Sequence, residues 1–136
     1  MTSAEEHFNG KTEKAIHQYE VALRIASLHN WHDEQLEFWN RYNLAALLLD
    51  ENRLDDAHVQ VQRAKAYATD DAYSLGRAME LQAEMWCSER VFGEAKTAAS
   101  RAADVYEKIG AAKCVENCRV IFQDIKESMN TRESDA

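Results

Sequence analysis

The chain has no proline and only four glycines among its 136 residues. Glycine supplies positive φ angles and proline presets φ, so folds with many tight turns depend on both. A β-sandwich or a β-barrel is such a fold and is therefore disfavoured. The chain is rich instead in alanine, glutamate, leucine, lysine, arginine and glutamine, which are good helix formers. We expect a single all-α domain, because a chain of this length can bury a core of its own.

Other absences limit where the protein works and what it binds. Its longest apolar run, Leu44–Leu49, is far shorter than the ~20 residues of a membrane span. The N-terminal segment carries Glu5 and Glu6, whereas a secretory signal is basic and then apolar. Three cysteines without the spacing of a disulfide framework suit a reducing compartment. Acidic side chains outnumber basic ones by 24 to 16, which disfavours binding to nucleic-acid phosphates. We expect a cytoplasmic protein with no nucleic-acid or membrane partner.

Apolar residues spaced by three and four predict helices along the whole chain. After a short helix from Ser3 to near Phe8, the predicted helices cover about residues 11–26, 33–49, 54–68, 73–86, 93–109 and 111–129. Asp33 and Asp71 are suitable N-caps, and Gly110 is a suitable C-terminal cap. We expect one domain over residues 1–129 and a disordered polar tail over residues 130–136.

Three of these helices begin with the same pattern of small residues. Ala15, Ala57 and Ala95 are each followed by an apolar residue four positions later and by an alanine seven positions later. The three anchor alanines are 42 and 38 residues apart. Small side chains let antiparallel helices approach closely, and a helix pair that recurs at a fixed period is typical of an α-solenoid.

The pattern resembles the tetratricopeptide repeat, in which the first helix of each pair carries a leucine and a small residue and the second carries alanines around an apolar residue. Positions that match the first helix are Leu44, Ala45 and Leu48 in one unit and Gln82, Ala83 and Trp86 in the next. The period near 40 exceeds the usual ~34 and no proline ends the second helix, so the repeats look more like the long-period variant of kinesin light chains. The resemblance implies a short right-handed α-solenoid (TPR-like superhelix). It would hold a partial repeat at about 3–31, repeats at about 33–69 and 71–109, and a capping helix at about 111–129.

In that family, ligands lie on the concave face formed by the first helices. Carried over position by position, the resemblance implies a peptide-binding face of Trp39, Tyr42, Asn43, Ala46, Leu49, Asp50, Arg77, Glu80, Leu81, Glu84, Cys87 and Ser88. Aromatic rings beside carboxylates would favour a partner segment with apolar and basic side chains. Trp39 and Tyr42 could instead pack against the first unit.

Residues with potential for chemistry have simpler interpretations. His29, His32 and Asp33 could supply metal ligands, but no further Cys/His cluster completes a tetrahedral site. Cys114 and Cys118 lie one helical turn apart and are expected to behave as small hydrophobes. The sequence has no phosphate-binding glycine loop, nucleophile elbow or His-Glu-x-x-His helix. We expect no catalytic residue, no metal and no cofactor.

The resulting hypothesis is a non-enzymatic scaffold that binds a protein or peptide segment on the concave face. The alternative is a structural or self-associating segment, because the first unit lacks most of its first helix. The apolar face of residues 11–26 would then need cover from a longer repeat array or from another copy of the chain. An enzyme with a cleft on a helical scaffold is the third class considered.

Overall fold

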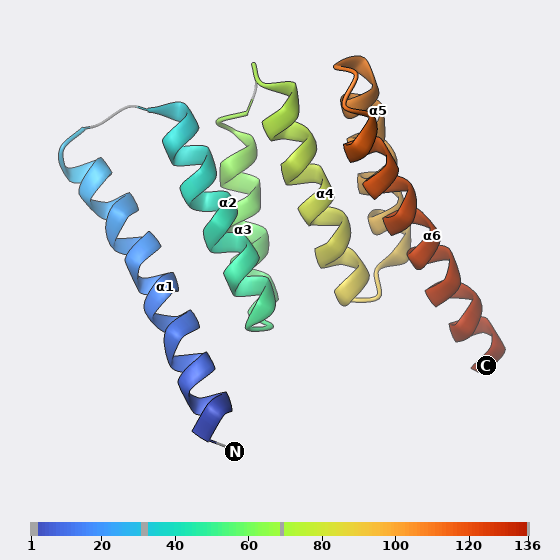
Figure 1. Cartoon of the computed structure of the whole chain (residues 1–136), viewed down its shortest axis with the longest axis horizontal. Helices are drawn as coiled ribbons and strands as arrows, with labels where there is room; N and C mark the ends of the chain where they lie inside the picture. The colour runs from blue at the N-terminus through green and yellow to red at the C-terminus, as the bar shows by residue number, and fades with distance from the viewer. Residues whose placement is uncertain (1–2, 31–32, 69, 136) are drawn as a thin grey trace. The chain divides into compact units, whose positions relative to one another are not determined.

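The computed structural model describes residues 3–30, 33–68 and 70–135, and all the regular structure in these ranges is α-helical. The helices are α1 (Ser3–Leu28), α2 (Glu34–Asp50), α3 (Leu54–Lys65), α4 (Ala72–Ser88), α5 (Phe92–Lys108) and α6 (Ala112–Asp135) (Figure 1). The prediction of an all-α fold is confirmed. The chain divides into two compact units, unit 1 (Met1–Tyr67) and unit 2 (Ala68–Ala136).

Unit 1 is built around α2, which packs against both α1 and α3. The three helices run alternately up and down (Figure 1). Its most deeply buried large side chains are Ile16 on α1, Phe38 and Leu44 on α2, and Val61 on α3. The anchor pattern of α3 is buried as expected, since Ala57, Val61 and Ala64 have no solvent exposure.

On α1 the same pattern is much less buried, because in the described part of unit 1 this helix packs only on α2. Ala15 and Tyr19 are half-buried and Ala22 is exposed. The matching alanines of α3 are instead fully buried. The spacing of small residues therefore marks a helix face correctly in both cases, whereas burial depends on whether a second helix covers that face.

Unit 2 has α5 packed between α4 and α6, and α6 also contacts α4. Ala95, Ala99 and Ala102 of α5 are buried, which allows the close helix approach that the repeat pattern predicts. One core cluster joins Ala102 and Tyr106 of α5 to Val115 and Cys118 of α6. Within each unit, neighbouring helices thus pack in a helical-repeat-like arrangement.

Helix ends explain how the chain manages with so little glycine. Asp33 and Asp71 cap α2 and α4, because their carboxylates accept the backbone N–H of Leu36 at 3.1 Å and of Ser74 at 3.2 Å, as expected from the sequence. At the other ends, Asn52, Arg90 and Gly110 have φ of 60°, 62° and 70° directly after α2, α4 and α5.

The backbone around these three residues forms the same pattern of hydrogen bonds. After α5, for example, the N–H of Ala111 donates to the Tyr106 carbonyl at 3.0 Å and the N–H of Gly110 to the Glu107 carbonyl at 3.1 Å. This is the Schellman motif, and the bonds after α2 and α4 repeat it. An asparagine and an arginine therefore take left-handed positions that glycine usually holds.

Two predicted boundaries are wrong. Residues 3–28 form one continuous helix, so no break follows Phe8. An internal glycine such as Gly10 costs only ~1 kcal/mol, whereas ending and restarting a helix leaves terminal N–H and C=O groups unpaired and repeats the nucleation cost. At the other end, α6 continues to Asp135, although the sequence analysis ends this helix at residue 129. Residues 130–135 contain no proline or glycine, so nothing in them stops the helix.

Candidate functional site

The twelve residues proposed from the family resemblance divide equally between α2 in unit 1 and α4 in unit 2. On α2, Trp39, Tyr42, Asn43, Ala46 and Leu49 are half-buried and Asp50 is exposed. The rings of Trp39 and Tyr42 meet edge to face with centroids 5.4 Å apart, and Trp39 also contacts Phe38 at 4.8 Å. The two aromatic residues therefore form one cluster on α2 with a partly exposed surface.

On α4 the predicted face is only partly open. Arg77 and Cys87 are half-buried and Glu84 and Ser88 are exposed, but Glu80 and Leu81 are only 5% and 4% exposed. The prediction that Glu80 belongs to an open acidic face, pointing away from the second helix of the pair, is wrong. Its carboxylate points toward α5 and α6 of unit 2, where it meets Tyr106 and Cys118.

The Glu80 carboxylate is the centre of a small buried polar cluster. Arg77 donates to Oε2 at 2.8 Å, the Tyr106 hydroxyl donates to the same oxygen at 3.5 Å, and the Cys118 thiol approaches Oε1 at 4.0 Å. Burial raises the pKa of Glu80 above its ordinary value, and the Arg77 charge and the Tyr106 hydrogen bond oppose that rise. Desolvation and the nearby Glu80 charge raise the pKa of Cys118 to about 12. The thiol is thus kept protonated, as expected for an inert core cysteine.

Unit 1 also has a concave surface outside the predicted face. It is a cavity of about 510 Å³ lined by α1, by the start of α2 and by Tyr67, and we call it the α1–α2 groove. Its lining residues are Leu23, Ala26, Ser27, Asn30, Asp33, Glu34, Glu37, Arg41 and Tyr67.

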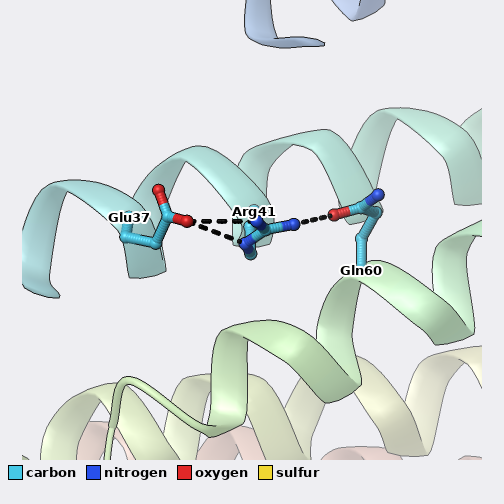
Figure 2. A network of polar contacts seen from close by, with 3 residues as sticks. All are labelled: Glu37, Arg41 and Gln60. Carbon is cyan, nitrogen blue, oxygen red and sulfur yellow. Dashed lines mark hydrogen bonds and ion pairs between the residues drawn. The ribbon is translucent and has the colours of Figure 1, made fainter. Parts of the chain in front are cut away.

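Arg41, which lines this groove, donates three side-chain hydrogen bonds (Figure 2). Its Nε and Nη2 donate to one carboxylate oxygen of Glu37 at 3.3 and 3.0 Å, and its Nη1 donates to the Gln60 side-chain oxygen of α3 at 3.0 Å. Both ionic side chains are mostly buried, with 17% and 21% exposure. A guanidinium has five N–H donors, so Arg41 can still donate to a ligand carbonyl while Glu37 offsets its charge.

The outer part of the groove is acidic. Asp33 and Glu34 are exposed carboxylates at the start of α2, and Asp33 uses one oxygen to cap the helix. With Glu37, the groove holds three carboxylates against the one guanidinium of Arg41. The charge left over is negative, which favours a cationic ligand group at the rim.

Sequence reasoning interpreted Asp33 as a cap and did not single out the other charged groups. The sequence does indicate that Glu37 and Arg41, spaced by four residues on one helix, can form an ion pair. It does not indicate that α1 and Tyr67 complete a groove around this pair, because those segments are distant in sequence.

Over residues 3–30, 33–68 and 70–135, no three His, Cys, Asp or Glu side chains gather in a way that could hold a metal ion. His32, one of the suggested ligands, lies outside the described residues. No helix in these same ranges combines the length and the apolar character that crossing a membrane requires.

Comparison with known proteins adds no relative to these observations. The resemblance to the tetratricopeptide repeat rests on the spacing of residues quoted above. Comparison of the chain with protein-family models, with curated proteins and with solved structures gives no match.

Proposed function

We propose that this chain is a non-enzymatic protein-interaction scaffold, and that unit 1 binds a peptide segment with apolar and basic side chains in the α1–α2 groove. The observation that carries the proposal is the composition of the groove, in which Leu23, Ala26 and Tyr67 lie near one guanidinium bound by Glu37, and exposed carboxylates stand at the rim. A ligand of this chemistry is the same class that the sequence predicts, although the groove is not the face that the sequence predicts.

Charge supports a basic segment over an acidic one. Asp33 and Glu34 are exposed, so they can pair with lysine or arginine side chains without prior desolvation. Arg41 is neutralised by Glu37 at 3.0 Å and can bind a backbone carbonyl of the ligand. These ion pairs and this hydrogen bond would mainly determine the direction and register of a bound peptide, and would contribute less to its affinity.

Apolar side chains of the groove supply the remaining contact surface. Leu23, Ala26 and Tyr67 line it, and Tyr67 is 37% exposed. Tyrosine is among the residues that contribute most to protein contacts. Leu28 at the end of α1 and Leu36 at the start of α2 are 76% and 51% exposed, but they do not line the groove.

The wider hypothesis concerns the whole chain. The pairs of packed helices and the buried alanines of α3 and α5 support a tetratricopeptide-like scaffold. A partner segment that also reaches Trp39 and Tyr42 on α2 would extend the same activity. Self-association is the second candidate, because exposed Leu28 and Leu36 could equally meet another copy of the chain.

The proposal is tested by fluorescence anisotropy with two labelled peptides that share their leucine positions, one with arginine and one with glutamate between the leucines. We expect the arginine peptide to bind in the α1–α2 groove and the glutamate peptide not to bind there. Glu34→Lys should weaken this binding by about tenfold, because it replaces an attraction by a repulsion at the rim. Ser27→Trp should abolish it by filling the groove.

Glu13→Lys is the matched control, since Glu13 is exposed on α1 but does not line the groove. It changes the net charge equally and should leave the affinity unchanged. Binding of the arginine peptide that survives Ser27→Trp, or equal effects of Glu34→Lys and Glu13→Lys, would contradict the proposed site. Sedimentation of the free chain distinguishes the second candidate, because self-association through Leu28 predicts a dimer that Leu28→Asp dissociates.

A further inference from the structure

Unit 2 has a concave surface of its own along the contact between α5 and α6. Two cavities of about 340 and 260 Å³ adjoin there and share Arg119 as a lining residue. We call the larger cavity the α5–α6 groove. It is lined by Ala99, Ser100, Ala103, Cys118, Arg119 and Phe122.

The shape of this groove follows from its small residues. Ala99, Ser100 and Ala103 share one side of α5, where they leave space opposite the Phe122 ring of α6. Phe122 also packs against the buried cluster of Ala83, Ala98 and Ala99, so its ring is held in place. The groove therefore has an apolar floor whose aromatic ring is held by its own packing.

Its charge is opposite to that of the α1–α2 groove. The Lys96 ammonium of α5 and the Lys126 ammonium of α6 lie 5.6 and 5.3 Å from the centroid of the same Phe122 ring. Neither lysine forms an ion pair with a carboxylate of the described residues. Both ammonium groups place positive charge beside the Phe122 ring, so an incoming carboxylate near that ring would be attracted to them.

Arg119 adds a third positive group with weak internal partners. It meets Glu107 at 3.9 Å and Glu116 at 3.5 Å, and all three side chains are more than half exposed. Exposed pairs of this kind contribute little, so Arg119 can exchange these carboxylates for one from a ligand.

We propose that the α5–α6 groove is a second docking site, whose occupant is an amphipathic segment of another protein with apolar side chains flanked by carboxylates. An apolar side chain of that segment enters beside Phe122, while its carboxylates pair with Lys96, Lys126 and Arg119. The site differs from the α1–α2 groove in its unit, its lining and the charge of its ligand. The chain would then hold two segments of opposite charge at separate places.

The test uses the full chain and two fluorescein-labelled helical peptides with identical leucine positions, one carrying glutamate and one carrying lysine on the remaining face. We expect the glutamate peptide to bind and the lysine peptide not to bind at this site. The double variant Lys96→Glu and Lys126→Glu should weaken binding of the glutamate peptide by about tenfold or more. Ser100→Trp should abolish it, because the indole fills the groove.

Matched controls come from the same helix. Thr97 and Arg101 are exposed on α5 and do not line the groove, so Thr97→Trp and Arg101→Glu should retain the affinity for the glutamate peptide. Circular dichroism verifies that each variant is folded. Glu34→Lys in unit 1 should leave this affinity unchanged, which separates failure at this site from failure at the α1–α2 groove.

Three outcomes would overturn the proposal. The first is no binding of the glutamate peptide, and the second is binding of the glutamate peptide that survives Ser100→Trp. The third is an equal loss of affinity in Ser100→Trp and in its control Thr97→Trp.

Discussion

Gly76 of α4 lies directly against the ring of Tyr106 on α5, and this contact predicts a large effect for a one-carbon substitution. A Cβ atom placed on Gly76 would lie 2.6 Å from Cε1, 2.8 Å from Cζ and 3.1 Å from Cδ1 of that ring. Favourable carbon–carbon contacts lie at ~3.5–4.0 Å. Tyr106 has no solvent exposure and its hydroxyl reaches Glu80, so the ring has no open space into which it can move.

The expected free energy follows from two opposing effects. Overpacking of a core costs ~1–3 kcal/mol, and the contact distances here place Gly76→Ala toward the upper part of that range. Alanine is a better helix former than glycine by ~1 kcal/mol, which offsets part of the cost. We expect Gly76→Ala to destabilise unit 2 by about 1–2 kcal/mol.

Urea unfolding followed by far-ultraviolet circular dichroism measures this change, and hydrogen exchange of the α4 and α5 amides locates it in unit 2. Gly93→Ala is the control, because Gly93 is also helical and its Cβ would meet no atom within 4 Å. That variant should be as stable as the wild type or slightly more stable. In a Tyr106→Leu background the cost of Gly76→Ala should disappear. A Gly76→Ala variant no less stable than the wild type would refute the reasoning.

Three further predictions concern unit 2. Gly110→Ala should lower the free energy of unfolding by ~1 kcal/mol, since Gly110 has φ of 70° and an alanine is strained in that conformation. Thermal or urea unfolding measures the change, and an unchanged unfolding midpoint would contradict the left-handed helix end at Gly110. Asp71→Ala should lower the free energy of unfolding by ~1 kcal/mol, because it removes the hydrogen bonds that the Ser74 N–H and the Ser74 hydroxyl donate to Asp71 at 3.2 and 2.9 Å. Asp70→Ala is the control, because Asp70 accepts neither of these bonds. Burial raises the folded-state pKa of Glu80. The stability that protonated Glu80 contributes is therefore complete below the ordinary glutamate pKa and is lost as the pH rises through the raised pKa. The free energy of unfolding, measured with urea across that pH range, should decline, and Glu80→Gln should make the decline smaller; a steeper decline in the variant would contradict the raised pKa.

The two proposed grooves have a common physical basis. In each, one helix of the pair lines the groove with small residues, Ala26 and Ser27 on α1 or Ala99, Ser100 and Ala103 on α5, and charged side chains stand at its rim. The rim of one is acidic through Asp33 and Glu34, and that of the other is basic through Lys96 and Lys126. A ligand that binds one groove should therefore be repelled from the other, so that each site selects its own segment.

The amino-acid sequence alone determined the helices and most of their ends. Asp33, Asp71 and Gly110 act where the sequence predicts, because a cap or a left-handed residue works through hydrogen bonds to neighbours three to five positions away. The sequence also predicts that the anchor alanines share one helix face, since helical spacing places them there whether or not that face is covered. It predicts interruptions of a helix less well, and α1 shows that a single glycine does not end a helix.

Only the tertiary structure decided which charged and apolar groups are available to a partner. Glu80 reads as a surface residue in its helical pattern, yet it is buried against Tyr106 and Cys118, which are 26 and 38 residues away. Likewise, the α1–α2 groove needs Tyr67 beside residues of α1 and α2, and the α5–α6 groove needs Lys96 and Lys126 at one ring. Periodicity assigns a side chain to a face of its own helix, but the free energy of burying or exposing that face depends on which distant helix packs against it.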